Sequence, residues 1–133
     1  MTPNQQKNLL KKAAAAMRHA YAPYSRFRVG AALLTREGRV FQGCNVENAS
    51  YGLTLCAERT ALGAAISAGH RHFTALAIAS NGQTASLPCG ACLQALAEFC
   101  RPDFVIVTAT ARNPVAMAIY PLKDLLPRAF RLG

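Results

Sequence analysis

The sequence predicts an α/β fold, a three-layer α/β/α sandwich around one mixed sheet of about five strands. Helical and strand-like patterns follow one another along the chain in the order α-β-β-α-β-α-β-β-α. A hairpin pattern stands at each end, and the helices between the middle strands would act as crossovers that cover the sheet. The chain has 133 residues, of which 52% are hydrophobic and 16% charged. This length and composition suit a single domain spanning residues 1–133.

The first half of the chain predicts a helix and a hairpin. Residues 4–20 are good helix formers with apolar residues at helical spacing. Pro23 follows, and proline disfavours helical geometry in the residue before it, so the helix should end there. Residues 27–35 and 40–46 have strand character, and the glycine-containing segment 36–39 between them predicts a turn.

The second half predicts three strands and three helices. A helix is expected for residues 56–68, because Gly69 can end it in the left-handed conformation. Residues 73–80 form an apolar run typical of a buried strand. Pro88 opens a further helix that continues through residues 91–100. The remaining elements are two strands and a short helix, at residues 104–110, 114–120 and 122–126.

The charge is strongly positive, with 15 Lys and Arg against 6 Asp and Glu and a net charge of +9. Such a balance raises the possibility of nucleic-acid binding. The basic residues are dispersed, however, and aromatic residues are not interleaved with them. Solubility explains the charge more simply, and we expect no nucleic-acid partner.

The N-terminal segment is polar, and no apolar stretch is long enough to span a bilayer. The five cysteines are an odd number with uneven spacing, which does not suit a disulfide framework. We therefore expect a cytoplasmic protein without a membrane partner, in which reduced thiols serve as ligands or nucleophiles.

Two short segments carry the chemistry, and each is predicted to open a helix. They are Cys56-Ala57-Glu58-Arg59 and Pro88-Cys89-Gly90-Ala91-Cys92. Cys89 and Cys92 are three residues apart, so one side of the first helical turn would hold both sulfurs. With Cys56 they would supply three thiolates to a tetrahedral Zn²⁺ and leave the fourth position open for water, as in catalytic zinc sites.

Three thiolates on a dication leave a negative centre, which weakens the ability of the metal to acidify water. The N-termini of two helices and a nearby cation would offset this charge, and Arg59 is the candidate cation. An ordinary surface salt bridge is the alternative for Arg59. Cys44 and Cys100 lack metal-ligand spacing and are most simply buried small side chains.

Glu58 stands two residues after the first ligand and is the candidate proton shuttle. Hydrolytic deamination needs a group that takes a proton from water and returns one to the ring nitrogen and the leaving amine. The alternative is a glutamate that only stabilises a helix N-terminus. C-x-x-C alone is a weak signal, but both segments together match the zinc deaminase signature H-x-E…P-C-x-x-C with Cys in place of His.

The chain resembles the small homotetrameric cytidine deaminases over nearly its whole length. The matching stretches are Ala22 to Ser25, Val29 to Leu33, Gly43 to Gly52, Cys56 to Ala61 and Ser86 to Cys92. The resemblance implies one Zn²⁺ per subunit and hydrolysis of cytidine and 2′-deoxycytidine to uridine and 2′-deoxyuridine with release of ammonia. It also implies a homotetramer whose sites are shared between subunits.

The resemblance assigns the nucleoside contacts. Phe27 resembles the aromatic residue that packs on the pyrimidine; the alternative, which we favour less, is plain core packing. Asn45 and Glu47 resemble the pair that binds the ribose hydroxyls; the alternative is that they only fix their loop. A carboxylate there would repel a phosphate, which favours nucleosides over nucleotides. The remaining matches are the backbone of Ala57 at the base amide edge, and Tyr51 and Phe130 reaching a neighbouring subunit's site.

Two positions depart from the family pattern. Leu93 follows Cys92 where the family commonly has arginine, which leaves more of the charge balance to Arg59. Arg128 stands where glycine is usual, which puts the path of the tail and of Phe130 in question. Two other functions stay open: deamination of a modified cytosine nucleoside or nucleoside antibiotic, and nucleic-acid binding around a structural zinc. The open fourth ligand position argues against the second.

Overall fold

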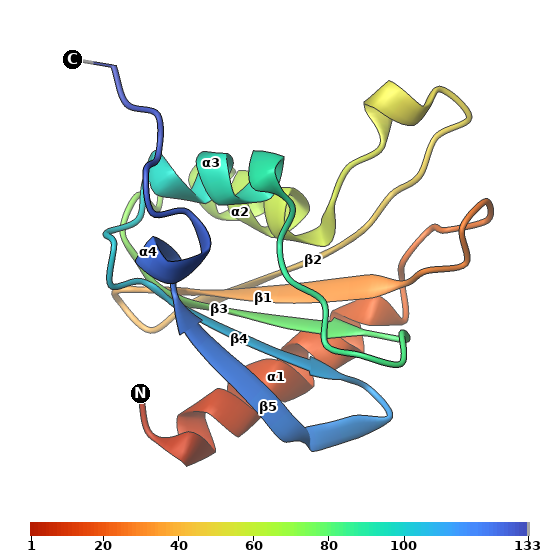
Figure 1. Cartoon of the computed structure of the whole chain (residues 1–133), viewed down its shortest axis with the longest axis horizontal. Helices are drawn as coiled ribbons and strands as arrows, with labels where there is room; N and C mark the ends of the chain where they lie inside the picture. The colour runs from red at the N-terminus through yellow and green to blue at the C-terminus, as the bar shows by residue number, and fades with distance from the viewer. Residues whose placement is uncertain (133) are drawn as a thin grey trace.

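The computed structural model describes residues 1–132 and contains one five-stranded sheet with helices on both faces (Figure 1). The strands are β1 (Val29–Thr35), β2 (Val40–Cys44), β3 (Phe73–Ser80), β4 (Val105–Thr110) and β5 (Asn113–Pro121). The helices are α1 (Pro3–Met17), α2 (Ala57–Ser67), α3 (Gly90–Ala97) and α4 (Leu122–Leu125), with a 3-10 turn, η1, at Tyr51–Leu53. The predicted α/β/α sandwich is confirmed.

The sheet has the strand order β2-β1-β3-β4-β5. Only β3 and β4 are parallel, and α3 makes the crossover between them. The other three pairings are antiparallel. Because β3 and β4 run side by side, the loop that leaves the carboxyl end of β3 can deliver the start of α3 above the sheet.

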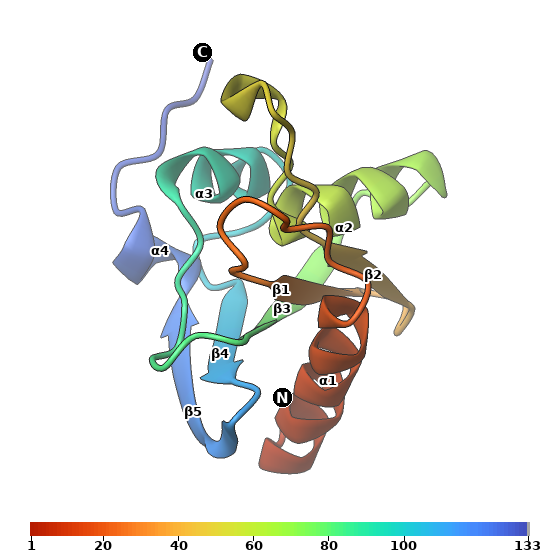
Figure 2. The same ribbon diagram turned by 90° about the vertical axis from the view of Figure 1, so that its right-hand side faces the viewer.

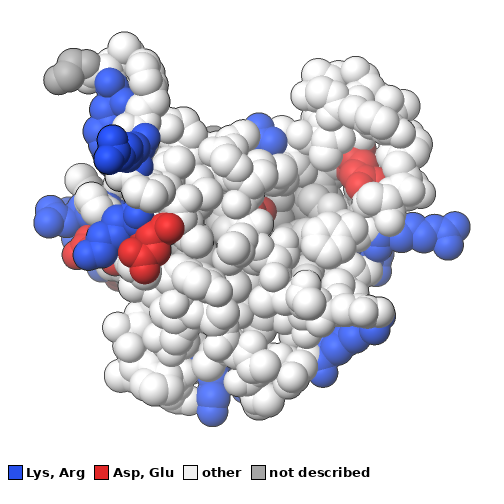
Figure 3. Space-filling view, in the orientation of Figure 1, with Lys and Arg blue, Asp and Glu red and all other residues white. Residues whose placement is uncertain are grey.

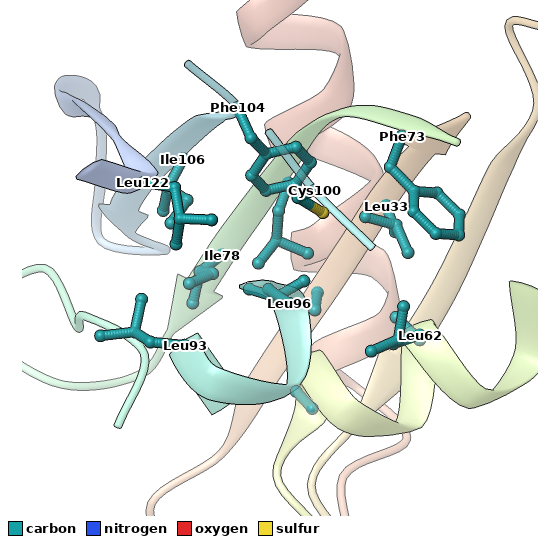
Figure 4. Close-up of a cluster of buried hydrophobic side chains, with 14 of the residues drawn as sticks. Leu33, Leu62, Phe73, Ile78, Leu93, Leu96, Cys100, Phe104, Ile106 and Leu122 are labelled. Atoms are coloured by element: carbon teal, nitrogen blue, oxygen red, sulfur yellow. The ribbon is translucent and has the colours of Figure 1, made fainter. Parts of the chain in front are cut away.

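The sheet lies between α1 on one face and α2 and α3 on the other (Figure 2), and alternate side chains of its strands enter two separate cores. Leu33, Ile78 and Ile106 point toward α2 and α3, in the cluster drawn in Figure 4. Alanines dominate the face that meets α1, for example Ala32 and Ala77. The period of two in these strands thus places large side chains on one face and small ones on the other.

Two glycines allow helices to approach the sheet closely. A Cβ atom at Gly30 would lie 2.0 Å from the carbonyl oxygen of Ala13 in α1. A Cβ atom at Gly43 would lie 2.4 Å from the backbone nitrogen of Ala61 in α2. Because α2 lies directly on β2, the start of this helix, with Cys56 as its N-cap, has a fixed position.

Several predicted boundaries differ from the observed ones. The first helix ends at Met17 and not near residue 20, and β1 begins at Val29 and not at residue 27. Phe27 and Arg28 are not part of the strand, and Arg26 just before them has a φ of 60°. α3 ends at Ala97, three residues before the predicted end. No helix among residues 1–132 is long and apolar enough to cross a membrane.

Candidate active site

The three predicted zinc ligands lie together where α2 and α3 begin. Cys56 is the N-cap of α2, Cys89 is the N-cap of α3, and Cys92 lies in the first turn of α3. Their sulfur atoms all lie within 4.8 Å of one another, and those of Cys89 and Cys92 are 3.6 Å apart. Zn–S bonds of about 2.3 Å in a tetrahedron need S···S separations of about 3.8 Å, so the donor set fits zinc. This is the one such cluster among the described residues.

The surroundings of the sulfurs explain why a cation is needed there. Burial opposes ionisation of Cys89, but hydrogen bonds from the backbone of Cys92 and Ala91 and from neighbouring sulfurs outweigh it and lower its pKa. Burial raises the pKa of Cys92, and the nearby charges of Glu58 and Cys56 raise it further. Three thiolates beside a carboxylate are therefore disfavoured by charge, and a dication would relieve this repulsion.

Arg59 lies next to the first ligand. Its Nη2 donates a hydrogen bond to the sulfur of Cys56 at 3.4 Å, and this bond raises the pKa of the guanidinium in spite of its partial burial. Its Nε is buried without a hydrogen-bond partner among residues 1–132. Arg59 forms no salt bridge in the described part of the chain. It contacts the sulfur cluster, as the charge argument required.

Glu58 is buried in the first turn of α2, with 6% of its surface exposed. Burial raises the pKa of its carboxyl, while its own backbone N–H, Arg59 and Cys92 counteract that rise. A carboxyl with a raised pKa holds and releases protons nearer to neutral pH than an exposed one. Because Glu58 lies beside the sulfurs, its carboxyl would be close to a metal ion that they bind.

Asn45 holds the backbone around Phe27. Its Nδ2 donates to the carbonyl oxygen of Phe27 at 2.7 Å, and its Oδ1 accepts from the N–H of Val29 at 2.9 Å. Asn45 therefore fixes the loop around Phe27, which is the structural role given above as the alternative to ribose binding. An amide has two N–H donors, so one remains available for a ligand.

Glu47 also fixes this segment. Its carboxylate accepts hydrogen bonds from the hydroxyl of Ser25 and from the N–H groups of Tyr24 and Ser25, at 3.0 and 3.2 Å for the latter two. The Ser25 hydroxyl contributes most to the lowering of the Glu47 pKa, against the effect of desolvation. The ionised carboxylate retains further lone pairs, since two oxygens offer about four acceptor sites.

The other predicted contacts differ in their exposure. Ala57 is fully buried at the start of α2, whereas Phe27 is 40%, Tyr51 77% and Phe130 68% exposed. Tyr51 packs edge-on against Tyr24 beside a cavity of about 360 Å³ that Glu47 also lines. The segment around η1, which contains Tyr51, and the C-terminal tail, which contains Phe130, rise on either side of a hollow (Figures 1 and 3).

The two departures from the family pattern have structural consequences. Leu93 is buried in the core between the sheet and α3, so its side chain adds no charge near the sulfurs (Figure 4). Arg128 fits without backbone strain, because Arg26 is the one non-glycine residue with positive φ among the described residues. The amide of Gln94 holds the tail through two hydrogen bonds with the backbone of Phe130, at 2.8 and 3.2 Å.

Three residues near the site were missed from the sequence: Ser25, Asn81 and Gln94. Each uses its side chain to hold backbone that is distant in sequence or lies in an irregular loop. Only Asn81 had a visible signal, because Asn-Gly marks a turn. The pairing partners of such side chains depend on the tertiary fold.

Comparison with known proteins gives consistent similarities. Residues 3–108 match the family described as the cytidine and deoxycytidylate deaminase zinc-binding region. The chain is 47% identical over 122 residues to a cytidine deaminase of Halalkalibacterium halodurans, covering 92% of this chain and 91% of that one. It is 45% identical over 131 residues to that of Mycobacterium tuberculosis, covering 98% and 93%. The crystal structure of cytidine deaminase from Burkholderia pseudomallei has a TM-score of 0.89 at 47% identity, covering 98% and 100%.

Proposed function

Because the chain belongs to the cytidine and deoxycytidylate deaminase family, we propose that it converts cytidine and 2′-deoxycytidine to uridine and 2′-deoxyuridine with release of ammonia. Zinc-dependent hydrolytic deamination of cytidine is the activity that this membership implies, and the chain is a cytidine deaminase. The observation that carries the site assignment is the cluster of three sulfurs beside the buried Glu58.

Cys56, Cys89 and Cys92 would hold one zinc ion per subunit, with Arg59 and the two helix N-termini balancing the sulfur charge. When bound, zinc supplies a Lewis acid that makes the attacking water reactive at neutral pH. The geometry that supports this assignment is the S···S separation together with the hydrogen bond from Arg59 to Cys56.

Glu58 moves the protons. Its carboxylate takes a proton from the water that attacks C4 and gives it to N3 of the pyrimidine. It then takes the remaining proton of the added hydroxyl and delivers it to the amine, which leaves as ammonia. Burial supports this role, since a carboxyl with a raised pKa is a better match to both transfers.

The exposed ring of Phe27 would pack on the pyrimidine, and the backbone of Ala57 would meet its amide edge. The free N–H of Asn45 and the free lone pairs of Glu47 would bind the ribose 3′-hydroxyl. A 3′-phosphate would meet the carboxylate of Glu47 in place of the hydroxyl, which favours nucleosides. Recognition through the 3′-hydroxyl leaves the 2′ position uncommitted, so both sugars should be accepted.

We also propose that the single 133-residue domain assembles into a homotetramer in the cytoplasm. Several large apolar side chains around the hollow are exposed in one chain: Tyr51, Leu53, Leu55, Leu87 and Phe130. Contiguous exposed apolar groups of this kind mark interaction surfaces. The unpaired Nε of Arg59 would find a partner in a completed site.

One assay tests the function. Purified protein is incubated with cytidine, 2′-deoxycytidine, cytidine 3′-monophosphate and a cytosine-containing oligonucleotide, while ammonia and pyrimidine absorbance are followed. We expect turnover of both nucleosides and little turnover of the phosphorylated substrates. Turnover of the oligonucleotide without turnover of the nucleosides would overturn the proposal, and activity on a modified cytosine nucleoside alone would support the alternative substrate.

A further inference from the structure

The backbone beside Phe27 has an unusual conformation. Arg26 has a φ of 60°, in the left-handed region that residues other than glycine seldom adopt. Such a conformation persists only where the surrounding structure fixes it, and it is common at functional sites. The surrounding hydrogen bonds identify what fixes Arg26.

Asn81, directly after β3, bonds to the backbone on both sides of Phe27. Its Nδ2 donates to the carbonyl oxygen of Arg26 at 3.0 Å, and its Oδ1 accepts from the N–H of Arg28 at 2.9 Å. Its own backbone N–H donates to the carbonyl oxygen of Arg28 at 3.1 Å. One residue therefore makes three hydrogen bonds to a loop more than fifty positions earlier in the chain.

The Phe27 ring itself lies against Gly82, the residue that follows Asn81. A Cβ atom at Gly82 would come within 3.0 Å of Cε1 of Phe27, closer than ordinary van der Waals contact. The ring is 40% exposed, so core packing does not hold it firmly. Its direction is instead set by the backbone on either side and by the surface that Gly82 leaves open.

We infer that Asn81 and Gly82 are positioning residues that set the orientation of the Phe27 ring and thereby the affinity for the pyrimidine. This inference rests on the proposed function, in which Phe27 packs on the base. Neither residue is required to touch the substrate: Asn81 fixes the backbone that carries the ring, and Gly82 leaves room for one ring edge.

The position of these residues in the chain gives the arrangement its use. Asn81 and Gly82 begin the loop that leads from β3 to α3. The same loop therefore holds the Phe27 ring at its start and leads to Cys89 and Cys92, two of the three zinc ligands, at its end. The segment that fixes the ring is thus joined directly to the start of α3, where these two sulfurs lie. A ring on an unsupported loop would lose affinity through the cost of ordering it.

The first test is the Asn81→Ala variant, with kcat and KM for cytidine measured separately. A ring that packs on the base in both ground and transition states provides uniform binding, so its loss raises KM with little change in kcat. We expect a rise in KM of about tenfold and a change in kcat below about threefold. Asn81→Asp keeps the acceptor for the N–H of Arg28 but loses the donor to the carbonyl oxygen of Arg26. Its KM should therefore lie between that of the wild type and that of Asn81→Ala.

Gln42→Ala is the matched control. The side-chain amide of Gln42 also donates a hydrogen bond to distant backbone, the carbonyl oxygen of Lys12 at 2.8 Å. This bond, however, joins β2 to α1 and does not contact the segment around Phe27. The Gln42→Ala variant should lose a comparable hydrogen bond without a change in the KM for cytidine. Equal rises in KM for the Gln42 and Asn81 variants would show a general loosening of the fold and would overturn the inference.

A double-mutant cycle with Phe27→Ala decides whether the effect passes through the ring. Residues that act as one unit are non-additive, so Asn81→Ala should add less than about twofold to KM in the Phe27→Ala background. Gly82→Ala, which removes no hydrogen bond but presses on Cε1, should likewise raise KM only while Phe27 is present. Additive effects in both cycles would refute the inference.

The proposed function and the positioning role of Asn81 and Gly82 are contradicted by different results. If the wild-type protein does not deaminate cytidine, the proposed function fails. If the wild type is active but Asn81→Ala leaves KM unchanged, only the positioning role fails. Thermal unfolding of each variant checks that the protein is folded, and the Asn81→Asp measurement remains informative should Asn81→Ala unfold.

Discussion

Glu58 joins two properties at one residue: a buried carboxyl and a place two positions beyond a candidate metal ligand. Its sequence position alone also suits a glutamate that merely stabilises a helix N-terminus. Such a glutamate would be exposed, whereas Glu58 is 6% exposed and faces the sulfurs. Burial of a carboxyl without a stability benefit is typical of catalytic groups.

Replacing Glu58 with Gln should abolish most of the activity and leave the metal in place. The amide has nearly the same shape but does not carry a proton between water and N3. Turnover of cytidine should fall by about 10²- to 10⁴-fold, the usual contribution of a general acid–base group. Zinc content, measured by metal analysis, should stay at one ion per chain. The exposed Glu98→Gln is the control, and near-normal turnover of Glu58→Gln would remove the shuttle role.

Cys100 illustrates a cysteine without a metal role. It is buried three residues after the end of α3, and burial raises the pKa of its thiol to about 12. The neutral form therefore predominates in the folded protein. Its contribution to stability is complete below the unfolded pKa of 9.0 and is lost as the pH rises toward 12, since the unfolded thiol ionises first.

Alkylation by iodoacetamide at pH 8, followed by peptide mass spectrometry, should therefore leave Cys100 unmodified in the native protein. The thiolate is the reactive form, and Cys100 is both neutral and inaccessible. The partly exposed Cys44 should react faster. Comparable rates for these two cysteines in the folded protein would contradict the packing described for α3.

At the scale of elements, contact between helix and sheet depends on glycines in the strands. Gly30 in β1 meets the carbonyl oxygen of Ala13, and the three atoms nearest to the position of its missing Cβ are all backbone atoms of α1. Backbone cannot rotate aside as a side chain can. The position of α1 is therefore tied to the absence of a side chain at this residue.

Gly30→Ala should destabilise the protein by about 3 kcal/mol, because overpacking displaces a whole helix. Gly63→Ala gives the opposite sign: Gly63 lies exposed in α2 with open space around its Cα, and alanine there should stabilise by about 0.5–1 kcal/mol. Urea unfolding of both variants measures the two changes. Equal stability of Gly30→Ala and the wild type would show that α1 shifts freely on the sheet.

At the scale of the whole molecule, the charges and the apolar surface suggest different uses. Lys and Arg side chains are dispersed over the face shown in Figure 3 and form no single patch there. Exposed apolar side chains, by contrast, include Tyr51 and Leu53 of η1 and Phe130 of the C-terminal tail, the two segments that flank the hollow. The proposed self-association would cover these side chains, whereas dispersed cations give a polyanion no continuous surface.

Mixed assemblies test the sharing of sites between subunits. Glu58→Gln removes the proton carrier, and Phe130→Ala removes an aromatic proposed to enter a neighbour's site, so each variant alone should have little activity. Co-expressed hybrids contain intact Glu58 in one subunit and intact Phe130 in another, and they should regain a measurable part of the turnover. Sedimentation analysis gives the subunit number. Hybrids no more active than the parents would contradict shared sites.

The sequence by itself determined the order of elements, the sandwich and the two metal-binding segments. These depend on local patterns: period-two alternation in strands such as 73–80, helix-opening residues such as Pro88, and fixed spacing between Cys89 and Cys92. The resemblance of long motifs also indicated the family before any coordinates. Boundaries were less accurate, because the end of α3 and the start of β1 depend on hydrogen bonds from other parts of the chain.

Only the tertiary structure decided how the loops are held around the site. Asn81 and Arg26 are separated by more than fifty residues, and no local pattern pairs an amide with one particular carbonyl oxygen. The occupied amide of Asn45 and the burial of Leu93 likewise follow from how the elements pack. Local sequence sets backbone preferences, whereas these side-chain partners exist only after distant segments have been brought together.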